Sequence, residues 1–563
     1  MAVARYETWV DTPQPLPIDD VATAAGIDTS TLLPYGRHVA KLPLDAGADN
    51  PRGAVVLITA LTPTPLGEGK TTTAIGLAQG LARLGRRPVL TLRQPSLGPT
   101  FGIKGGAAGA GRSQVVPPDL LNMHLTGDFH AVTSAHNLLA AMVDNHLHHG
   151  NATGLDPRTI TWPRVLDMND RALRHIVIGL GARADGVTRE SSFEITAASE
   201  VMAVLALAHD RADLRDRLGR IVVGYRVDGS PVTAEDLGAA GAMAAILRDA
   251  LLPNLMQTTE GMPVLVHTGP FGNISIGNSS VVADQVGARL GDFLITEAGF
   301  GSDLGAERYV NIKSRVTGLV PHVAVVVVTV RALKTHSGNF RIVAGRALPA
   351  GLLEEDTAAV AAGLHNLAHH VRTVRHWGIA PVIAINVFPE DHPSEHAVIE
   401  QFAARLGVPA VRTTHVTDGG AGAVELARAV ADAVDGRPAP ALHRDYELDM
   451  PVAEKLLAVA RGVHGAAGID VSPEAARELG RLTALGFGGL PVVVAKTHLS
   501  LTHVPGLEPD GAWVLPVREV RLAAGAGYVY ALCGTISTMP GLPAHPNAER
   551  VDVDAVGSIT GLL

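Results

Sequence analysis

The sequence AVVLITALTPTPLGEGKTT, at residues 54–72, decides the class of fold. Its first eight residues form a short apolar run, which is typical of a β-strand that is buried on both faces. Gly67 and Gly69 follow, and Lys70 and Thr71 open a segment whose apolar residues have helical spacing. The stretch therefore predicts a strand, a glycine-rich loop and a helix, in that order.

The glycine-rich loop is predicted to bind nucleotide phosphates, because its backbone N–H groups and the helix N-terminus would point toward an anion. Lys70 is expected to reach the terminal phosphates and Thr71 to hold a magnesium ion. The match to the pattern G-x-x-x-x-G-K-[ST] is incomplete, since Thr64 stands where the first glycine belongs. The predicted nucleotide-binding residues are Thr64, Pro65, Leu66, Gly67, Glu68, Gly69, Lys70, Thr71 and Thr72.

The same alternation of strand and helix continues along the chain. Short apolar runs recur at residues 88–92, 264–267, 323–330, 381–386, 492–495 and 528–532. Helical spacing of apolar residues is found at 71–84, 131–146, 199–208, 237–249, 357–377, 423–434 and 453–464. This alternation predicts an α/β protein with parallel sheets and helices on both faces of each sheet.

The length of 563 residues favours several domains, at roughly 150 residues per domain. We predict a P-loop nucleotide-binding core formed by residues 1–130 together with 305–365. An α/β middle domain is predicted at 131–304. A C-terminal α/β domain at 366–563 is expected to contribute to an acceptor cleft.

Composition excludes several classes of function. A formal net charge of −9 gives no general attraction for nucleic acid or for an anionic membrane. A single cysteine, Cys533, excludes a disulfide framework, a cysteine-based zinc site and an iron–sulfur cluster built from this chain, and with it a redox ATPase. The first residues lack a signal-peptide pattern, so a cytoplasmic enzyme that does not enter a membrane is expected.

Arg93 is expected to approach the same pocket, because it follows the strand predicted at residues 88–92. Its planar guanidinium suits a carboxylate or a transferring phosphoryl group, whereas the alternative is a surface arginine at a strand end. Asp128 precedes a predicted helix, so it could orient a nucleophile or cap that helix. The loop at residues 297–307 is either a ligand loop or an ordinary turn. Histidines 146, 148 and 149 suggest a metal site only weakly.

Taken together, these runs resemble the formate–tetrahydrofolate ligase family over nearly the whole chain. The resemblance rests on the phosphate-binding loop and on further matching segments. These are residues 104–109, 124–128, 167–174, 297–307, 329–334, 517–521 and 538–543.

This resemblance implies an enzyme of one-carbon metabolism that uses ATP with Mg²⁺, formate and tetrahydrofolate. It also implies a homotetramer and stimulation by a monovalent cation, K⁺ or NH₄⁺. ATP would phosphorylate formate, and N10 of tetrahydrofolate would attack the formyl phosphate. The resemblance assigns catalytic roles to Lys70, Arg93 and Asp128 and the Mg²⁺ contact to Thr71. Phe300 would line the folate or nucleotide side of the cleft.

The sequence departs from the family mainly on the acceptor side. Gln94 stands where the family usually has glutamate, and residues 273–280 read Asn-Ile-Ser-Ile-Gly-Asn-Ser-Ser in place of Asn-Ile-Ala-His-Gly-Cys-Asn-Ser. The family's tryptophan that stacks on the pterin is Val416, while the opposing aromatic remains as Phe388. Two alternatives therefore stay open. One is a diverged paralogue that formylates another amine or activates another small carboxylate, and the other is a non-catalytic ATP-binding regulatory protein.

Overall fold

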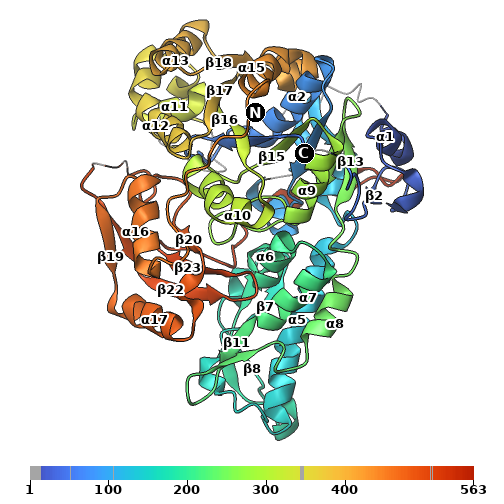
Figure 1. Ribbon diagram of the computed structural model, residues 1–563, viewed down its shortest axis with the longest axis vertical. Helices are drawn as coiled ribbons and strands as arrows, with labels where there is room; N and C mark the ends of the chain where they lie inside the picture. Colours follow the sequence, from blue (N-terminus) through green and yellow to red (C-terminus); the bar gives the residue numbers. More distant parts are fainter. Residues whose placement is uncertain are drawn as a thin grey trace.

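The computed structural model describes residues 14–50, 52–104, 107–340, 342, 348–507, 509 and 511–562 (Figure 1). Its centre is a sheet of twelve strands in the order β1-β2-β13-β14-β4-β15-β3-β16-β17-β18, with β6 paired to β13 and β5 paired to β6. The strands from β14 to β18 in this order are parallel to one another. The predicted α/β class with a parallel sheet is confirmed.

The parallel part of the sheet consists of β14 (Pro263–Val266), β4 (Pro88–Leu92), β15 (Phe293–Glu297), β3 (Ala54–Ala60), β16 (Pro321–Val328), β17 (Ala380–Asn386) and β18 (Ala410–Thr413). The antiparallel edge consists of β1 (Leu33–Pro34), β2 (Ala40–Lys41), β13 (Asn254–Thr258), β5 (Gly109–Ala110) and β6 (Ser113–Val116).

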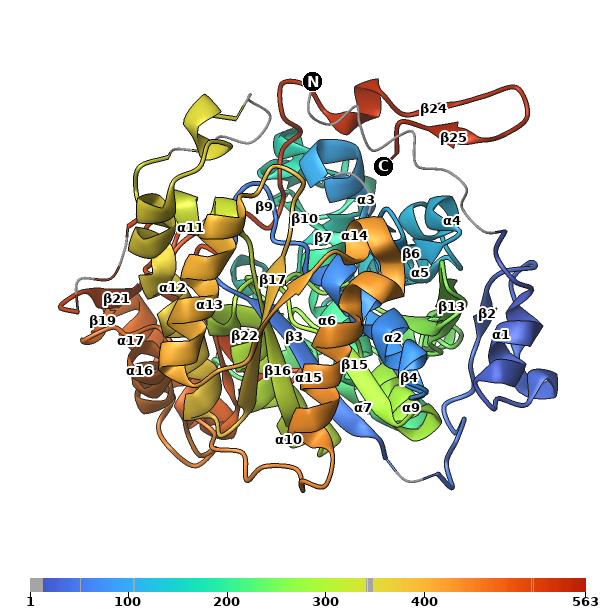
Figure 2. The ribbon, with the colours of Figure 1, turned by 90° about the horizontal axis from the view of Figure 1, so that it is seen from above.

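Helices cover both faces of this sheet, as Figure 2 shows. Successive residues of β3 point to opposite faces, so Val55 and Leu57 join one core while Val56 and Ile58 join another. The first core also contains α11 (Val330–His336), α12 (Thr357–His376) and α13 (Pro393–Leu406). The second contains α2 (Lys70–Arg83) and α15 (Val424–Val434). Burial on both faces explains why the central strands are almost purely apolar.

Two lobes flank the sheet (Figure 1). The middle lobe contains α5 (Asp128–His148), α6 (Glu200–Leu207), α7 (Arg211–Arg220) and α8 (Ala240–Ile246) with small two-stranded sheets. The C-terminal lobe contains α16 (Val452–Gly462), α17 (Pro473–Ala484), and a three-stranded sheet of β20 (Val492–Ala495), β23 (Tyr528–Leu532) and β22 (Glu519–Ala523).

The central sheet takes strands from all three of the predicted domains. β3 and β4 come from residues 1–130, β13 to β15 from 131–304, and β17 and β18 from 366–563. The division of the chain into three domains stays a prediction, and any such division has to assign one continuous sheet to several sequence segments.

Candidate active site

The predicted phosphate-binding loop connects β3 to α2, at the carboxyl edge of the parallel strands. Gly67 and Gly69 have φ angles of +75° and +74°, a backbone conformation that side-chain-bearing residues rarely adopt. A Cβ atom on Gly69 would lie 2.3 Å from Nδ2 of Asn386. The loop therefore requires glycine at this position both for its conformation and for its close contact with the end of β17.

Glu68 holds the loop from inside. Its side chain is 2% exposed, and its Oε1 accepts a hydrogen bond from the backbone N–H of Thr64 at 2.7 Å. Its Oε2 accepts from the hydroxyl of Thr329, which follows β16, at 3.0 Å. The carboxylate of Glu68 thus binds the backbone of Thr64, the residue that stands where the usual pattern has its first glycine.

We expect Glu68→Ala to weaken ATP binding by about tenfold and to lower the free energy of unfolding by about 2 kcal/mol, because it removes two charge-assisted hydrogen bonds from a buried loop. Calorimetric titration with MgATP and chemical denaturation would measure the two effects. Thr329→Val keeps the bond from Glu68 to Thr64 but removes the bond to Oε2 and the N-cap of α11, so it serves as a control for which we expect a smaller loss of ATP affinity. An unchanged ATP affinity in Glu68→Ala would contradict this account of the loop.

Lys70 differs from the other lysines of the site and the cores. Its half-buried ammonium makes no hydrogen bond or ion pair with the described residues, and its burial lowers the pKa while the carboxylates of Glu297 and Glu68 oppose that shift. Five other lysines each donate to a carboxylate or a carbonyl oxygen: Lys41, Lys313, Lys334, Lys455 and Lys496. Lys70 is thus available to a ligand at the mouth of the loop.

Glu297, the last residue of β15, contacts two of the predicted site residues, Thr71 and Arg93. Its Oε2 accepts a 2.6 Å hydrogen bond from the hydroxyl of Thr71, and its Oε1 lies 3.7 Å from the guanidinium of Arg93. Arg93 also donates to the carbonyl of Pro270 at 3.2 Å. Glu297 belongs to the loop at 297–307, but sequence reasoning gave it no role of its own, because only the sheet order places β15 beside β3.

Asp128 lies in a buried ion pair, which neither of the two roles predicted for it includes. Its carboxylate is 3% exposed and binds the ammonium of Lys41 at 2.8 Å, while its Oδ2 also accepts from Nδ2 of Asn254. The capping alternative is wrong: Gly127, with φ of +87°, is the N-cap of α5, and Asp128 is the first helical residue. A catalytic role for Asp128 stays a prediction, and it now has to involve a carboxylate that is already paired.

The three predicted acceptor residues lie on two sides of the phosphate-binding loop. Phe300 follows β15, which neighbours β3 on one side, whereas Phe388 and Val416 follow β17 and β18 on the other. The guanidinium of Arg331 lies over the ring of Phe388, 4.2 Å from its centroid. Phe388 and Val416 are both partly exposed. The site therefore offers one aromatic side chain on each side of the loop.

The formate–tetrahydrofolate ligase family model matches residues 9–563. The chain is 58% identical over 552 residues to the formate–tetrahydrofolate ligase of Cutibacterium acnes, with 97% of this chain and 98% of that protein covered. It is 56% identical to formate–tetrahydrofolate ligase 3 of Rubrobacter xylanophilus and to the ligase of Saccharopolyspora erythraea, again over 97% of this chain and 98% and 97% of theirs. The chain belongs to the formate–tetrahydrofolate ligase family.

Membership of this ligase family confirms the resemblance found in the sequence and the prediction of an ATP-using enzyme. It also gives meaning to the buried polar atoms that lack a hydrogen-bond partner among the described residues. Several of these gather where the parallel strands end: Arg93 Nε, Gln94 Oε1, Thr268 Oγ1, Asn278 Oδ1 and Asn386 Oδ1. Unpartnered buried polar atoms are rare in folded proteins, so these atoms at the ends of the parallel strands are candidates for contact with a ligand.

Other motifs of this ligase have structural roles or lie partly outside the described residues. His146 bonds to Thr153, and His148 stacks edge-on against His149. In the described part of the chain there is no group of three or more His, Cys, Asp or Glu side chains that could hold a metal ion. The glycine-rich segment at 104–111 includes residues 105 and 106, which are outside the described residues. No described helix is both long and apolar enough to cross a membrane.

Proposed function

We propose that this chain joins formate to N10 of tetrahydrofolate and cleaves ATP to ADP and phosphate in the process. The observation that carries the proposal is that Thr71 and Arg93 both contact Glu297, while the neighbouring Lys70 has no hydrogen-bond or ion-pair partner among the described residues. Formate is a poor electrophile until one of its oxygens is phosphorylated, so a site that positions a γ-phosphoryl group beside a carboxylate-binding arginine suits this chemistry.

In this proposal the backbone of the loop holds the β- and γ-phosphates, and Lys70 neutralises charge on the phosphoryl group as it moves to formate. Arg93 binds formate and then the formyl phosphate through its planar fork. The amine of the acceptor attacks the formyl carbon, and the resulting tetrahedral adduct expels phosphate. Each step depends on the fixed positive charge of Lys70 and Arg93.

Mg²⁺ would bind at Thr71 and Glu297. A hydroxyl from the loop and a carboxylate from the neighbouring strand are the oxygen ligands that hold Mg²⁺ in other phosphate-binding loops, and these two are already 2.6 Å apart. The ion would neutralise charge on the phosphates. For a monovalent cation such as K⁺ or NH₄⁺, the unpartnered oxygens of Gln94, Thr268 and Asn278 are the candidate ligands.

The aromatic residues on the two sides of the phosphate-binding loop would bind different heterocycles, the pterin on one side and the nucleotide base on the other. Phe388 and Val416 flank the acceptor side, where the resemblance places the pterin, which leaves Phe300 for the nucleotide base on the opposite side. The deciding experiment incubates the protein with ATP and formate, with and without tetrahydrofolate, and follows ADP and formylated product by mass spectrometry. If formylation required a different amine, the diverged-paralogue alternative would be favoured. Light scattering would test separately whether the protein is a homotetramer.

Val416→Trp is expected to strengthen tetrahydrofolate binding by about tenfold. An aromatic ring on a flat heterocycle contributes roughly 0.5–1.5 kcal/mol beyond burial, and 1.4 kcal/mol corresponds to tenfold in affinity. Folate titrations of both proteins would measure the change, with Val416→Leu as a control for added bulk without stacking. Tight binding by the unaltered protein, unchanged by the tryptophan, would show that the pterin site lies elsewhere.

A further inference from the structure

A buried ion pair joins the C-terminal lobe to the loop at residues 297–307. Lys496, which follows β20, is fully buried, and its ammonium donates to Oδ2 of Asp303 at 2.7 Å. Asp303 is 2% exposed. Burial alone would raise the pKa of this carboxyl, but the charge of Lys496 lowers it below its ordinary range. The pair is therefore ionised in the folded protein.

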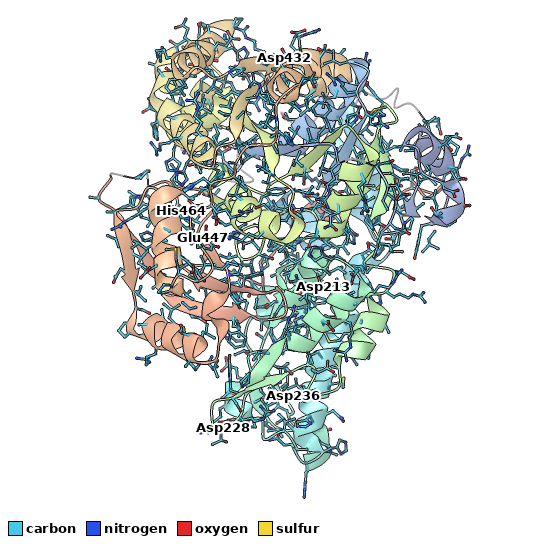
Figure 3. All side chains as sticks on the ribbon, in the orientation of Figure 1. Asp213, Asp228, Asp236, Asp432, Glu447 and His464 are labelled. Atoms are coloured by element: carbon cyan, nitrogen blue, oxygen red, sulfur yellow. The ribbon has the colours of Figure 1, made fainter. Side chains whose placement is uncertain are left out.

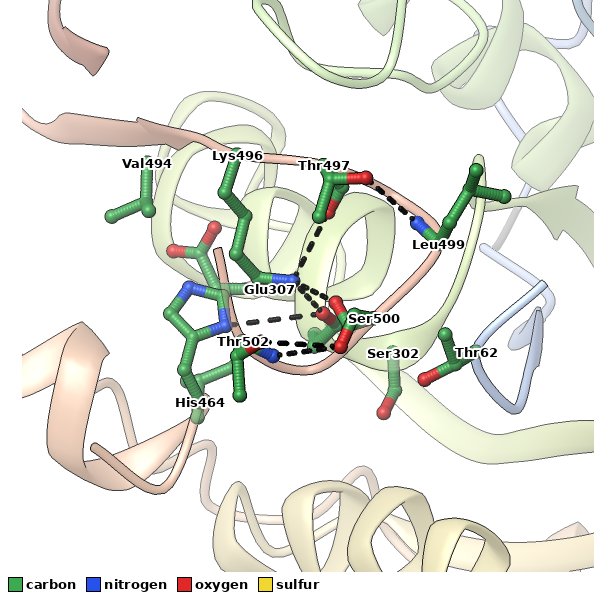
Figure 4. Close-up of polar contacts among 12 residues, drawn as sticks. Thr62, Ser302, Glu307, His464, Val494, Lys496, Thr497, Leu499, Ser500 and Thr502 are labelled. Atoms are coloured by element: carbon green, nitrogen blue, oxygen red, sulfur yellow. Dashed lines mark hydrogen bonds and ion pairs between the residues drawn. The ribbon is translucent and has the colours of Figure 1, made fainter. Parts of the chain in front are cut away.

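The same ammonium shapes the loop that follows it (Figure 4). It donates to the carbonyl of Ser500 at 2.6 Å and to that of Thr497 at 3.2 Å, so all three donors of Lys496 are used. Between these two carbonyls lies His498. Its ring stacks on Phe300 with the centroids 4.3 Å apart and the planes at 28°. Lys496 thus fixes the loop that supports the ring of Phe300.

Phe300 needs such support because its backbone is strained. Its φ angle is +64°, which is a genuine outlier for an aromatic residue and is unfavourable. Asp303 lies three residues further along, so the ion pair holds this segment from its C-terminal side. Strain of this kind persists only where the surrounding contacts over-determine it.

The segment is also tied to the phosphate-binding loop. Ser302 Oγ and Nδ1 of His370 are 2.6 Å apart, and Nε2 of His370 lies 3.0 Å from the hydroxyl of Thr62. Thr62 lies two positions before Thr64, the first residue of the phosphate-binding loop. Burial lowers the pKa of His370 to about 3, so this bridge is neutral at physiological pH. Ser302 and Thr62 lie close together in Figure 4.

His464 completes the cluster where the C-terminal lobe meets the sheet (Figure 3). Its ring lies 3.9 Å from Asp303, it is fully buried, and neither ring nitrogen has a hydrogen-bond partner among the described residues. Burial, and then the charge of Lys496, lower the pKa of this imidazole well below its ordinary value. A neutral His464 leaves Lys496 as the cation bonded to Asp303.

We propose that Asp303 and Lys496 are positioning residues for the nucleotide base: their ion pair holds Phe300 and His498 in the stacked arrangement that receives the base. This rests on the proposed function only in placing the base, not the pterin, at Phe300. The ion pair of Asp303 and Lys496 acts through Phe300. Removal of the ion pair and removal of the Phe300 ring should therefore weaken nucleotide binding to the same extent.

The test is the affinity for MgATP, measured by calorimetry without formate or folate. The double variant Asp303→Asn/Lys496→Met removes both charges together, which avoids leaving one buried charge unpaired. We expect it and Phe300→Ala each to weaken MgATP binding by about tenfold, the size of a lost ring stack. The triple variant should bind no more than about twofold more weakly than either, because residues that act as one unit are not additive.

A matched ion pair separates positioning from stability. Lys334 donates to Glu354 O at 2.6 Å and to Leu352 O at 3.2 Å, and it pairs with Glu395 at 2.6 Å. Both side chains of this ion pair are as buried as those of Asp303 and Lys496. Glu395→Gln/Lys334→Met should lower the melting temperature but leave MgATP affinity unchanged. Three outcomes would each overturn the proposal. The first is an equal loss of MgATP affinity in both double variants, and the second is an unchanged affinity in Asp303→Asn/Lys496→Met or in Phe300→Ala. The third is a triple variant whose loss of affinity is the product of the losses in Asp303→Asn/Lys496→Met and Phe300→Ala. Wild-type protein that binds MgATP but forms no formylated product would refute the proposed function alone.

Discussion

Lys70→Ala is expected to lower formate-dependent ADP formation by about 10³-fold or more, with little change in thermal stability. A cation that stabilises a transferring phosphoryl group is worth 10³–10⁵ in rate. Lys70 makes no hydrogen bond or ion pair within the described residues, so its removal breaks no contact of the folded protein. Burial of its ammonium carries a desolvation cost, which the carboxylates of Glu297 and Glu68 oppose and a bound anion would offset further.

The measurements are ADP release at saturating substrates and thermal melting of the variant and its parent. Arg83→Ala removes a cation from the far end of the same helix, where Arg83 pairs with Glu260 on the surface, and should leave turnover unchanged. Near-normal turnover of Lys70→Ala would remove the assignment of residues 64–72 as the phosphate-binding loop.

The phosphate-binding loop was predictable because everything it needs is contiguous in sequence. Residues 54–72 contain a strand that is buried on both faces, two glycines with positive φ and the start of a helix. The same holds for Ser472, whose side chain caps α17 as the following Pro473 suggests. Local sequence encodes local geometry here, and the prediction needs no knowledge of strand order.

The partners of the loop were not predictable, because they come from distant segments. Glu297 meets Thr71 across 226 positions, and Thr329 meets Glu68 across 261. The capping alternative for Asp128 was wrong, since the residue that binds its carboxylate, Lys41, lies on the two-residue strand β2, which has no sequence signal of its own. The separation of Phe300 from Phe388 likewise follows only from the sheet order.

Arg93→Lys is expected to lower kcat by about 10²–10³-fold while the KM for ATP changes little. A lysine keeps the charge, but a point charge cannot make the two parallel hydrogen bonds that a guanidinium makes to a carboxylate or an acyl phosphate. Removal of a group that stabilises developing charge typically costs that much in rate. The position of Arg93 makes the loss specific to the chemical step in the proposed mechanism, since its guanidinium lies beside Glu297 and Pro270.

Arg87→Lys is the matched control, because Arg87 precedes the same strand β4 and binds Asp292 through two nitrogens at the opposite edge of the sheet. Arg87→Lys loses the contact of two guanidinium nitrogens with Asp292, and Arg93→Lys loses the capacity to make such a contact with a ligand. Of the two arginines, only Arg93 faces the phosphate-binding loop. Steady-state kinetics with each substrate varied in turn would separate kcat from KM. If Arg93→Lys raised only the KM for ATP, Arg93 would be an anchor for the nucleotide, and the group that binds formate and stabilises formyl phosphate would have to be sought among the unpartnered polar atoms around Gln94.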